Sequence, residues 1–253
     1  MIVIKHLSKS FGKLEALKDV NLQIQGGQIT AILGPNGSGK TTLIKSILGM
    51  VIPDKGDILV DGKPVTGEWQ YRSLISYMPQ ISAFPENLTI NDLIALLTRI
   101  RGEKGDPETF IRMFGLESYL NKRVKHLSGG TRQKANVMMA CMFNSPLIIM
   151  DEPTSGLDPA AMLRLKTYVK EQKRQQKTVL FTTHIMSLVE DLADEIVFLL
   201  EGRIHYQGSP QALKQMTNAN NLEVAIAAIL QGSPVSNTTT QSNHVKSLAI
   251  QHD

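Results

Sequence analysis

The chain has 253 residues, of which 42% are hydrophobic and 20% charged, a balance typical of a folded globular protein and not of a disordered or fibrous one. Its 27 Lys and Arg residues against 23 Asp and Glu residues give a net charge of only +4, which supports anionic partners weakly, so no nucleic-acid partner is expected. The longest apolar runs, 137–143 and 224–230, are far shorter than the ~20 residues that span a bilayer, which excludes direct membrane insertion by a helix. A lone cysteine, Cys141, and an N-terminus without the apolar core of a signal peptide predict an intracellular, soluble protein of the α/β class.

The first 65 residues read as short β-strands separated by turns. The run 29–33 is almost continuously apolar, which is typical of a strand buried on both faces. A glycine-rich loop and a helix at 41–48 follow it. Gly26 and Gly27 predict a hairpin turn. The predicted strands of this region are 2–4, 22–25, 28–33 and 58–60.

From about residue 86 to residue 144 the pattern becomes helical. Thr89–Asp92 has the composition of a capping box, and Asp106 with Pro107 predicts an N-cap followed by proline at the first helical position. Strands and helices alternate again from Leu147, with strands at 147–150 and 178–182, helices at 159–175 and 187–193, and a hairpin across Gly202. Ser187 and Glu190 predict a second capping box. We therefore expect one α/β domain over 1–231, interrupted by a helical insert at about 86–144, and a disordered polar tail at 232–253.

The glycine-rich loop carries the strongest signal for chemistry. It begins at Gly34, after the buried strand, and ends with Lys40 and Thr41 at the start of a helix. In this setting backbone N–H groups wrap around nucleotide phosphates, and the positive end of the helix favours the same anion. Lys40 is expected to reach the β- and γ-phosphates, and the Thr41 hydroxyl to ligate Mg²⁺. The predicted nucleotide-binding residues are Gly34, Pro35, Asn36, Gly37, Ser38, Gly39, Lys40 and Thr41.

An acidic pair ends the apolar strand at 147–150. Asp151 can lie near the Mg²⁺ at the end of a buried sheet, and Glu152, which points elsewhere, could orient or deprotonate the attacking water. Taken alone, the pair is as readily a solvated acidic turn after a strand. The phosphate loop in the same chain favours the catalytic interpretation.

A second anion-binding signal lies at residues 127–133. Ser128, Gly129 and Gly130 stand at the predicted start of a helix, as the phosphate loop does. A chain with one phosphate loop gains from a second such site only if that site acts on the nucleotide of another chain.

Together these motifs resemble those of the ATP-binding cassette (ABC) family, and the resemblance covers residues 1–231. The motifs occur in the order of the family: phosphate loop at 34–42, a segment ending in Gln80, the LSGGT signature at 127–131, the acidic pair, and 155–158. The resemblance implies a P-loop NTPase of the ABC ATPase fold, with an N-terminal antiparallel β subdomain and an inserted helical subdomain. It also implies an ATPase that works as a dimer, with two ATP molecules held between the phosphate loop of one subunit and the signature of the other.

The resemblance also implies roles for five further residues. Gln80 would touch Mg²⁺ or the water and couple to a membrane partner, and His184 would contact the γ-phosphate. Asp158 would bridge the dimer, and Thr42 belongs to the phosphate loop. Phe11 stands where the family usually stacks a Tyr under adenine, so it keeps the stacking surface but loses a hydroxyl. Four of the five have a plainer alternative: Gln80 as a loop residue, His184 as a polar strand end, Asp158 as a helix N-cap and Phe11 as a core aromatic.

The implied partners are a second ATPase subunit, most simply in a homodimer, and an integral-membrane permease that would hold the pair on the cytoplasmic face. The segments 84–90, 208–210 and 221–224 resemble ATPases of ABC-2-type exporters of drugs, lipids or polysaccharides. Within that group, residues 127–134 and 46–51 are most similar to NosF-type proteins, which serve complexes that mature the copper sites of nitrous-oxide reductase.

Two alternatives are weighed against these expectations. Met138, Met139, Cys141 and Met142 offer soft copper ligands, but no His or second Cys completes a set, and helix packing explains them better. A soluble ATPase of DNA repair or translation could also carry an SGG signature. Such proteins place long coiled coils between the two halves or hold two cassettes, and this chain is too short for either.

Overall fold

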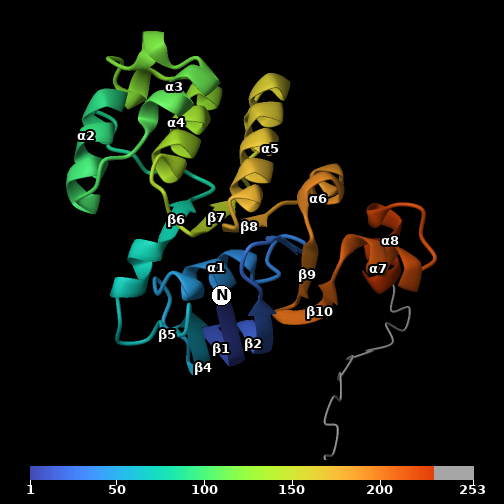
Figure 1. The fold of residues 1–253 in the computed structure, drawn as a ribbon. Coiled ribbons are helices and arrows are strands. Elements are labelled where there is room, and N and C mark those ends of the chain that lie inside the picture. Colours follow the sequence, from blue (N-terminus) through green and yellow to red (C-terminus); the bar gives the residue numbers. More distant parts are fainter. Residues whose placement is uncertain (231–253) are drawn as a thin grey trace, which may run out of the picture.

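A computed structural model describes residues 1–230. The expected polar tail at 232–253 lies outside this range. Two β-sheets and three groups of helices make up the described part of the chain (Figure 1). Within it, no helix has the length and apolar content needed to cross a membrane.

The larger sheet has the strand order β10-β9-β3-β8-β7-β6. Its strands from β9 to β6 run parallel, and β10 is antiparallel to β9. Strands β3, β7 and β8 are buried at every residue, as their apolar runs predict. The strands are β3 (Ile29–Leu33), β6 (Ile75–Met78), β7 (Leu147–Asp151), β8 (Thr178–Thr182), β9 (Glu195–Leu200) and β10 (Arg203–Gly208).

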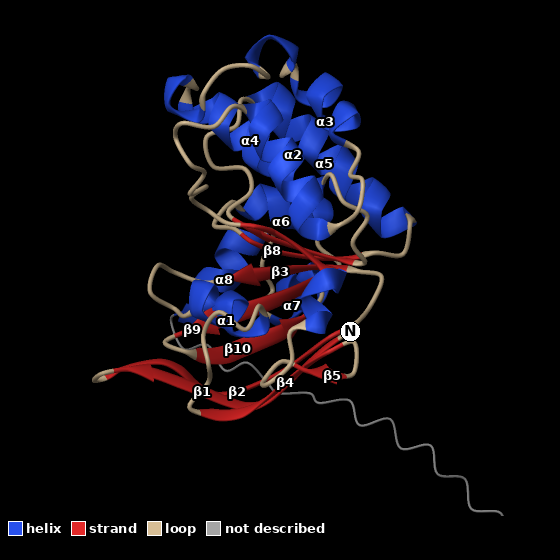
Figure 2. Cartoon of the chain, turned by 90° about the vertical axis from the view of Figure 1, so that its left-hand side faces the viewer, coloured by secondary structure: helices blue, strands red, loops and turns tan. Residues whose placement is uncertain are grey.

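The smaller sheet is antiparallel, with the order β2-β1-β4-β5. Helix α1 (Lys40–Ile47) lies between the two sheets, and its Leu43, Ile44 and Ile47 are fully buried with residues of both. Figure 2 shows this layering, with the antiparallel sheet on one side of the larger sheet and most helices on the other. The strands are β1 (Ile2–Phe11), β2 (Leu14–Ile24), β4 (Lys55–Val60) and β5 (Lys63–Pro64).

The chain leaves the larger sheet after β6 and returns to the neighbouring strand β7, and between them it is helical, where the insert was expected. The capping box of Thr89 with Asp92 and the N-cap of Asp106 before Pro107 are both confirmed. The insert contains α2 (Ile90–Arg101), α3 (Pro107–Phe114) and α4 (Gly129–Cys141), with 3-10 turns at Glu117–Tyr119 and Val124–His126. A further 3-10 turn, Gln70–Leu74, precedes β6.

The remaining helices complete the cover of the larger sheet. They are α5 (Pro159–Arg174), α6 (Met186–Leu192), α7 (Pro210–Met216) and α8 (Leu222–Leu230). A single apolar core joins residues of α2 to α8 to β3, β7, β8 and β9. Met138, Met139, Cys141 and Met142 are at most 5% exposed and belong to this core, which agrees with the packing interpretation.

One turn prediction and one helix-cap prediction were wrong. Gly26 and Gly27 do not close a hairpin, because β2 belongs to the antiparallel sheet and β3 to the larger one, so the turn carries the chain between sheets. Ser187 does not cap α6, because the helix begins a residue earlier with Ile185 at its N-cap and no side-chain cap. Glu190 instead accepts hydrogen bonds from Lys214 Nζ and the Leu222 N–H, both at 3.2 Å, and thereby ties α6 to the two C-terminal helices.

Candidate functional site

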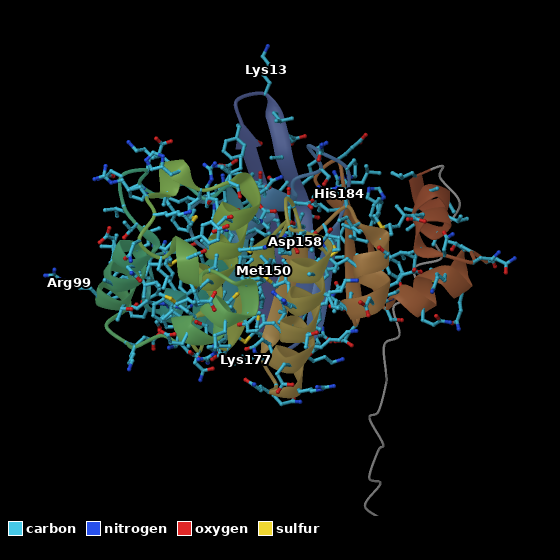
Figure 3. All side chains as sticks on the ribbon, turned by 90° about the horizontal axis from the view of Figure 1, so that it is seen from above. Lys13, Arg99, Met150, Asp158, Lys177 and His184 are labelled. Carbon is cyan, nitrogen blue, oxygen red and sulfur yellow. The ribbon has the colours of Figure 1, made fainter. Side chains whose placement is uncertain are left out.

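The carboxyl ends of four neighbouring parallel strands carry the predicted motifs to one edge of the larger sheet. The phosphate loop follows β3, Gln80 follows β6, the acidic pair ends β7, and His184 follows β8. In Figure 3, Asp158 and His184 lie on the side where the β1–β2 tip, marked by Lys13, projects, and Lys177, which precedes β8, lies at the opposite end. Ligands of open α/β sheets bind at this edge, so the topology gathers the candidate residues where such sheets bind ligands.

The phosphate loop turns sharply because its glycines adopt conformations that other residues resist. Gly34 and Gly39 have φ angles of 154° and 107°. A Cβ on Gly34 would lie 2.1 Å from the Leu199 carbonyl oxygen, and one on Gly39 would lie 2.5 Å from that of Ala16. Only glycine fits this close approach of backbones. The loop delivers the chain into α1, whose N-terminus favours an anion.

Lys40 lies across the loop that precedes it. Its Nζ donates to the carbonyl oxygens of Gly34 and Pro35 at 2.7 and 3.0 Å. Burial lowers the pKa of Lys40, and the charges of Glu152 and Asp151 oppose that shift. The ammonium group is therefore held among oxygen acceptors at the mouth of the loop, where a phosphate would provide stronger, charged acceptors.

Asp151 is fixed by the strand next to it. Its Oδ1 accepts a hydrogen bond from Thr182 Oγ1 at 2.5 Å, and its Oδ2 accepts one from Thr41 Oγ1 at 3.4 Å. The register places Asp151 beside Thr182 in the β7–β8 pair. Burial raises the pKa of Tyr77, in β6, to about 12, and the Asp151 charge adds to this rise, so the phenol stays neutral beside the carboxylate. A hydroxyl and a carboxylate oxygen facing each other are hard ligands of the kind Mg²⁺ prefers.

Glu152, directly after Asp151, has an unusual backbone conformation. Its φ of 48° is left-handed, which is uncommon outside glycine and occurs at functional sites that the surrounding structure constrains. Its N–H donates to Thr182 Oγ1 at 2.9 Å, and its Oε2 lies 3.0 Å from His184 Nδ1. Glu152 is 8% exposed and His184 is exposed, so the pair connects the buried strand end to the open edge.

A cavity of about 240 Å³ brings the phosphate loop and the acidic pair together. Its end at the β1–β2 hairpin is apolar, with Phe11 half-exposed there. A larger cavity, of about 680 Å³, lies between α3 and α5 and is lined by none of the residues predicted to bind nucleotide or Mg²⁺, so we assign the site by chemistry and not by size. The smaller cavity is lined by Phe11, Leu14, Ala16, Asn36, Gly37, Gly39, Lys40, Thr41, Thr42, Gln80, Asp151 and Glu152.

The signature does not line this cavity. Ser128 is exposed and caps α4, accepting a hydrogen bond from the Thr131 N–H at 3.2 Å. Asp158 is also outside the cavity: it caps α5 and pairs with Lys134 Nζ at 2.5 Å. The Lys134 hydrogen bond lowers the pKa of Asp158, with the Ala161 N–H as a further cause. Within one chain, the two predicted anion sites are therefore separate.

Sequence reasoning missed Thr182, which touches both acids of the pair. A threonine inside an apolar strand carries no motif, and only the register of β8 against β7 reveals its neighbours. It also missed Leu14 and Ala16, because their proximity to the phosphate loop arises from the packing of the antiparallel sheet.

Comparisons with known proteins give the family. The model of the ABC transporter family matches residues 17–155. The chain is 32% identical over 240 residues to the uncharacterized ABC transporter ATP-binding protein YxlF of Bacillus subtilis, covering 92% of this chain and 79% of that protein. It is 33% identical to the lantibiotic transport ATP-binding protein SrtF of Streptococcus pyogenes, covering 86% of this chain and 96% of that one.

Solved structures agree. An ATP-binding subunit of an ABC transporter superposes with a TM-score of 0.85 at 30% identity, covering 91% of this chain and 99% of its own. The dimeric cassette MJ0796, in a post-hydrolysis state with ADP and Pi, superposes with a TM-score of 0.73 at 26% identity, covering 83% and 98%. The expected fold, with an antiparallel sheet and inserted helices, is confirmed. The chain belongs to the ABC transporter family, and it is an ATP-binding cassette of the ABC ATPase class.

Proposed function

We propose that two copies of this chain enclose two ATP molecules and use their hydrolysis to drive a membrane permease. One observation carries the proposal: the cavity is lined by the phosphate loop and the acidic pair, while the exposed Ser128, which caps α4, does not line it. The helix N-terminus at Ser128 is suited to bind an anion, but it does not share a cavity with the phosphate loop of its own chain. It can act on a nucleotide if it closes over the one bound to a second chain. The structurally similar cassette MJ0796 is described as a dimer in a post-hydrolysis state bound to ADP and Pi, which supports a dimeric assembly.

The residues of the cavity fit a nucleoside triphosphate. Phe11, Leu14 and Ala16 offer an apolar surface for a base, and the loop with Lys40 offers donors for the phosphates. The Ser38 hydroxyl, buried inside the loop, has no hydrogen-bond partner among the described residues. A bound phosphate could supply the hydrogen-bond partner that this hydroxyl lacks.

The same residues suit Mg²⁺. Thr41 and Asp151 would hold it, with Gln80 on the same cavity wall. When bound, the ion would neutralise phosphate charge.

We assign the following roles to four residues of the proposed dimeric site. Glu152 deprotonates or orients the attacking water, since its carboxylate lines the cavity and is held by His184 and not by the Thr41–Asp151 pair. His184 holds Glu152 Oε2 at 3.0 Å and would contact the γ-phosphate from the open edge. Lys40 binds the β- and γ-phosphates, and Asp158 reaches the second subunit.

The transporter that these cassettes serve is proposed to be an exporter of the ABC-2 type. Support comes from SrtF, whose description is a lantibiotic transport ATP-binding protein. A NosF-type role in the maturation of copper sites rests on the resemblance of residues 127–134 and 46–51. Met138 and its neighbours are buried in the core, and the described residues hold no cluster of three or more His, Cys, Asp or Glu suited to a metal. In either complex the chain would supply energy from the cytoplasmic face and would not bind copper itself.

Affinity capture from detergent-solubilised membranes tests the proposal. The tagged chain with Glu152→Gln should retain an integral-membrane partner in the presence of MgATP, and mass spectrometry should identify it. A permease with neighbouring copper-maturation proteins would support the NosF-type role, and a permease alone would support the exporter. Recovery of nucleic acid or ribosomes in place of a membrane protein would contradict both.

A further inference from the structure

Helix α4 contacts the loops of its own nucleotide site along one face. Gly130 lies beside the Gly156 carbonyl oxygen, which a Cβ on Gly130 would approach to 3.1 Å. One turn later Lys134 pairs with Asp158. The helix that begins with the signature is therefore packed against loops that follow the acidic pair.

Asn136 extends these contacts to the Gln80 loop. It is 2% exposed, in a stretch of α4 where its neighbours are apolar. Its Nδ2 donates to the carbonyl oxygen of Pro79 at 2.9 Å. A buried amide without such a partner is costly, so this bond constrains the Pro79 carbonyl as well as the side chain.

The loop that Asn136 holds has few other restraints. Pro79 follows β6, and Gln80, exposed, lines the cavity with Asp151 and Glu152. Apart from the Asn136 bond, residues 79–84 make no hydrogen bond to another element in the part of the chain that the structure describes. The hydrogen bond from α4 to this loop therefore lies directly beside Gln80, the residue expected to touch Mg²⁺ or the attacking water.

We infer that Asn136 is a positioning residue that acts through Gln80: it fastens the Gln80 loop to the helix whose first turn carries the signature. In a dimer, Ser128 of that helix meets the nucleotide of the partner, while Gln80 serves the nucleotide of its own chain. Asn136 stands eight residues after Ser128, about 12 Å along the helix, and so joins the two sites within one rigid element. This inference rests on the proposed dimeric ATPase and specifies how its two sites communicate.

A double-mutant cycle with Gln80→Ala tests the inference. Asn136→Leu keeps the branched shape of four heavy atoms but removes the donor, so kcat should fall about tenfold, as loss of one hydrogen bond allows, while the affinity for a fluorescent ATP analogue stays within twofold. In the Gln80→Ala background the same substitution should change kcat by less than about twofold, because the residue through which it acts is gone. If Asn136→Leu does not fold, Asn136→Ala, which suits a helix, replaces it in the cycle.

A matched control separates positioning from stability. Gln172 is another buried helical amide, and its Oε1 accepts a hydrogen bond from Lys177 Nζ at 2.6 Å, at the far end of the sheet (Figure 3). Gln172→Leu should lower the melting temperature and leave kcat unchanged. Equal losses of kcat on Asn136 substitution in both backgrounds, or no loss in the active wild-type background, would overturn the inference. A wild-type chain that hydrolyses no ATP would overturn the proposed function, and the inference with it.

Discussion

At the scale of single residues, Glu152 offers the sharpest test of the proposed chemistry. The Thr182 hydroxyl accepts a hydrogen bond from the backbone N–H of Glu152, whose carboxylate lies 3.0 Å from His184 Nδ1 and lines the cavity. Glu152→Gln keeps the shape and removes the base, so ATP binding should persist while turnover falls by ~10²–10⁴-fold. Phosphate release and nucleotide affinity measured on the same preparation check this. Glu171→Gln, in α5 and outside the cavity, is the control, and an unchanged turnover number in Glu152→Gln would assign the base elsewhere.

Lys40 tests binding and not chemistry. Its ammonium, now bonded to two carbonyl oxygens of its own loop, would exchange them for charged phosphate oxygens. Lys40→Ala should therefore weaken ATP affinity by about tenfold or more, since hydrogen bonds to charged groups contribute ~1.5–3 kcal/mol. Calorimetric titration with ATP is the measurement. Lys45→Ala, an exposed lysine on the same helix, should bind as the wild type does, and equal affinities for all three proteins would refute the assigned role.

At the scale of elements, the methionines of α4 and its C-terminus could be taken either for core residues or for copper ligands. Met138, Met139 and Met142 are buried in the main core beside the sheet. Replacing all three with Leu should leave folding and ATPase activity largely intact, because volume-conserving apolar changes usually cost under ~1.5 kcal/mol each. Thermal melts, phosphate release and Cu(I) titration test this together. Stoichiometric Cu(I) binding by the wild type that is lost in the triple variant would show that the methionines form a metal site.

Elements that lie beside a motif or a clear cap were predicted to within a residue or two, whereas β6, α7 and α8 were not predicted. The sequence indicates β3, β7 and β8 because each is a short apolar run before a motif. The predicted strands 2–4 and 22–25 cover only part of β1 and part of β2. The rest was missed because bulges shift the pairing register of these two strands, and His6 and Asp19 adopt positive φ angles. A bulge breaks the two-residue alternation on which strand prediction depends.

The site shows the same division between local and long-range information. The phosphate loop and the acidic pair are each a continuous segment of the sequence, so the residue types within a few positions indicate their chemistry. Thr182 and Asn136 act through partners 31 and 57 positions away, so the contacts exist only once the sheet and helix have assembled. Glu190 was predicted to form a capping box with Ser187, but its carboxylate accepts hydrogen bonds from Lys214 and Leu222 of the C-terminal helices. These tertiary partners compete with local ones and cannot be seen in the neighbouring sequence.

At the scale of the whole molecule, hydrolysis should require two chains, because the phosphate loop and Ser128 do not meet within one. With ATP as part of the interface, hydrolysis per chain should rise with protein concentration and reach a plateau once dimers dominate. A Ser128→Arg chain and a Lys40→Ala chain, each nearly inactive alone, should recover activity when mixed. In the mixed dimer one composite site carries both defects, while the other pairs an intact Lys40 with an intact Ser128. Phosphate release from each variant and from the mixture, at several protein concentrations, measures this. Specific activity that is independent of concentration where gel filtration shows monomer, with no recovery on mixing, would mean that a single chain hydrolyses ATP unaided.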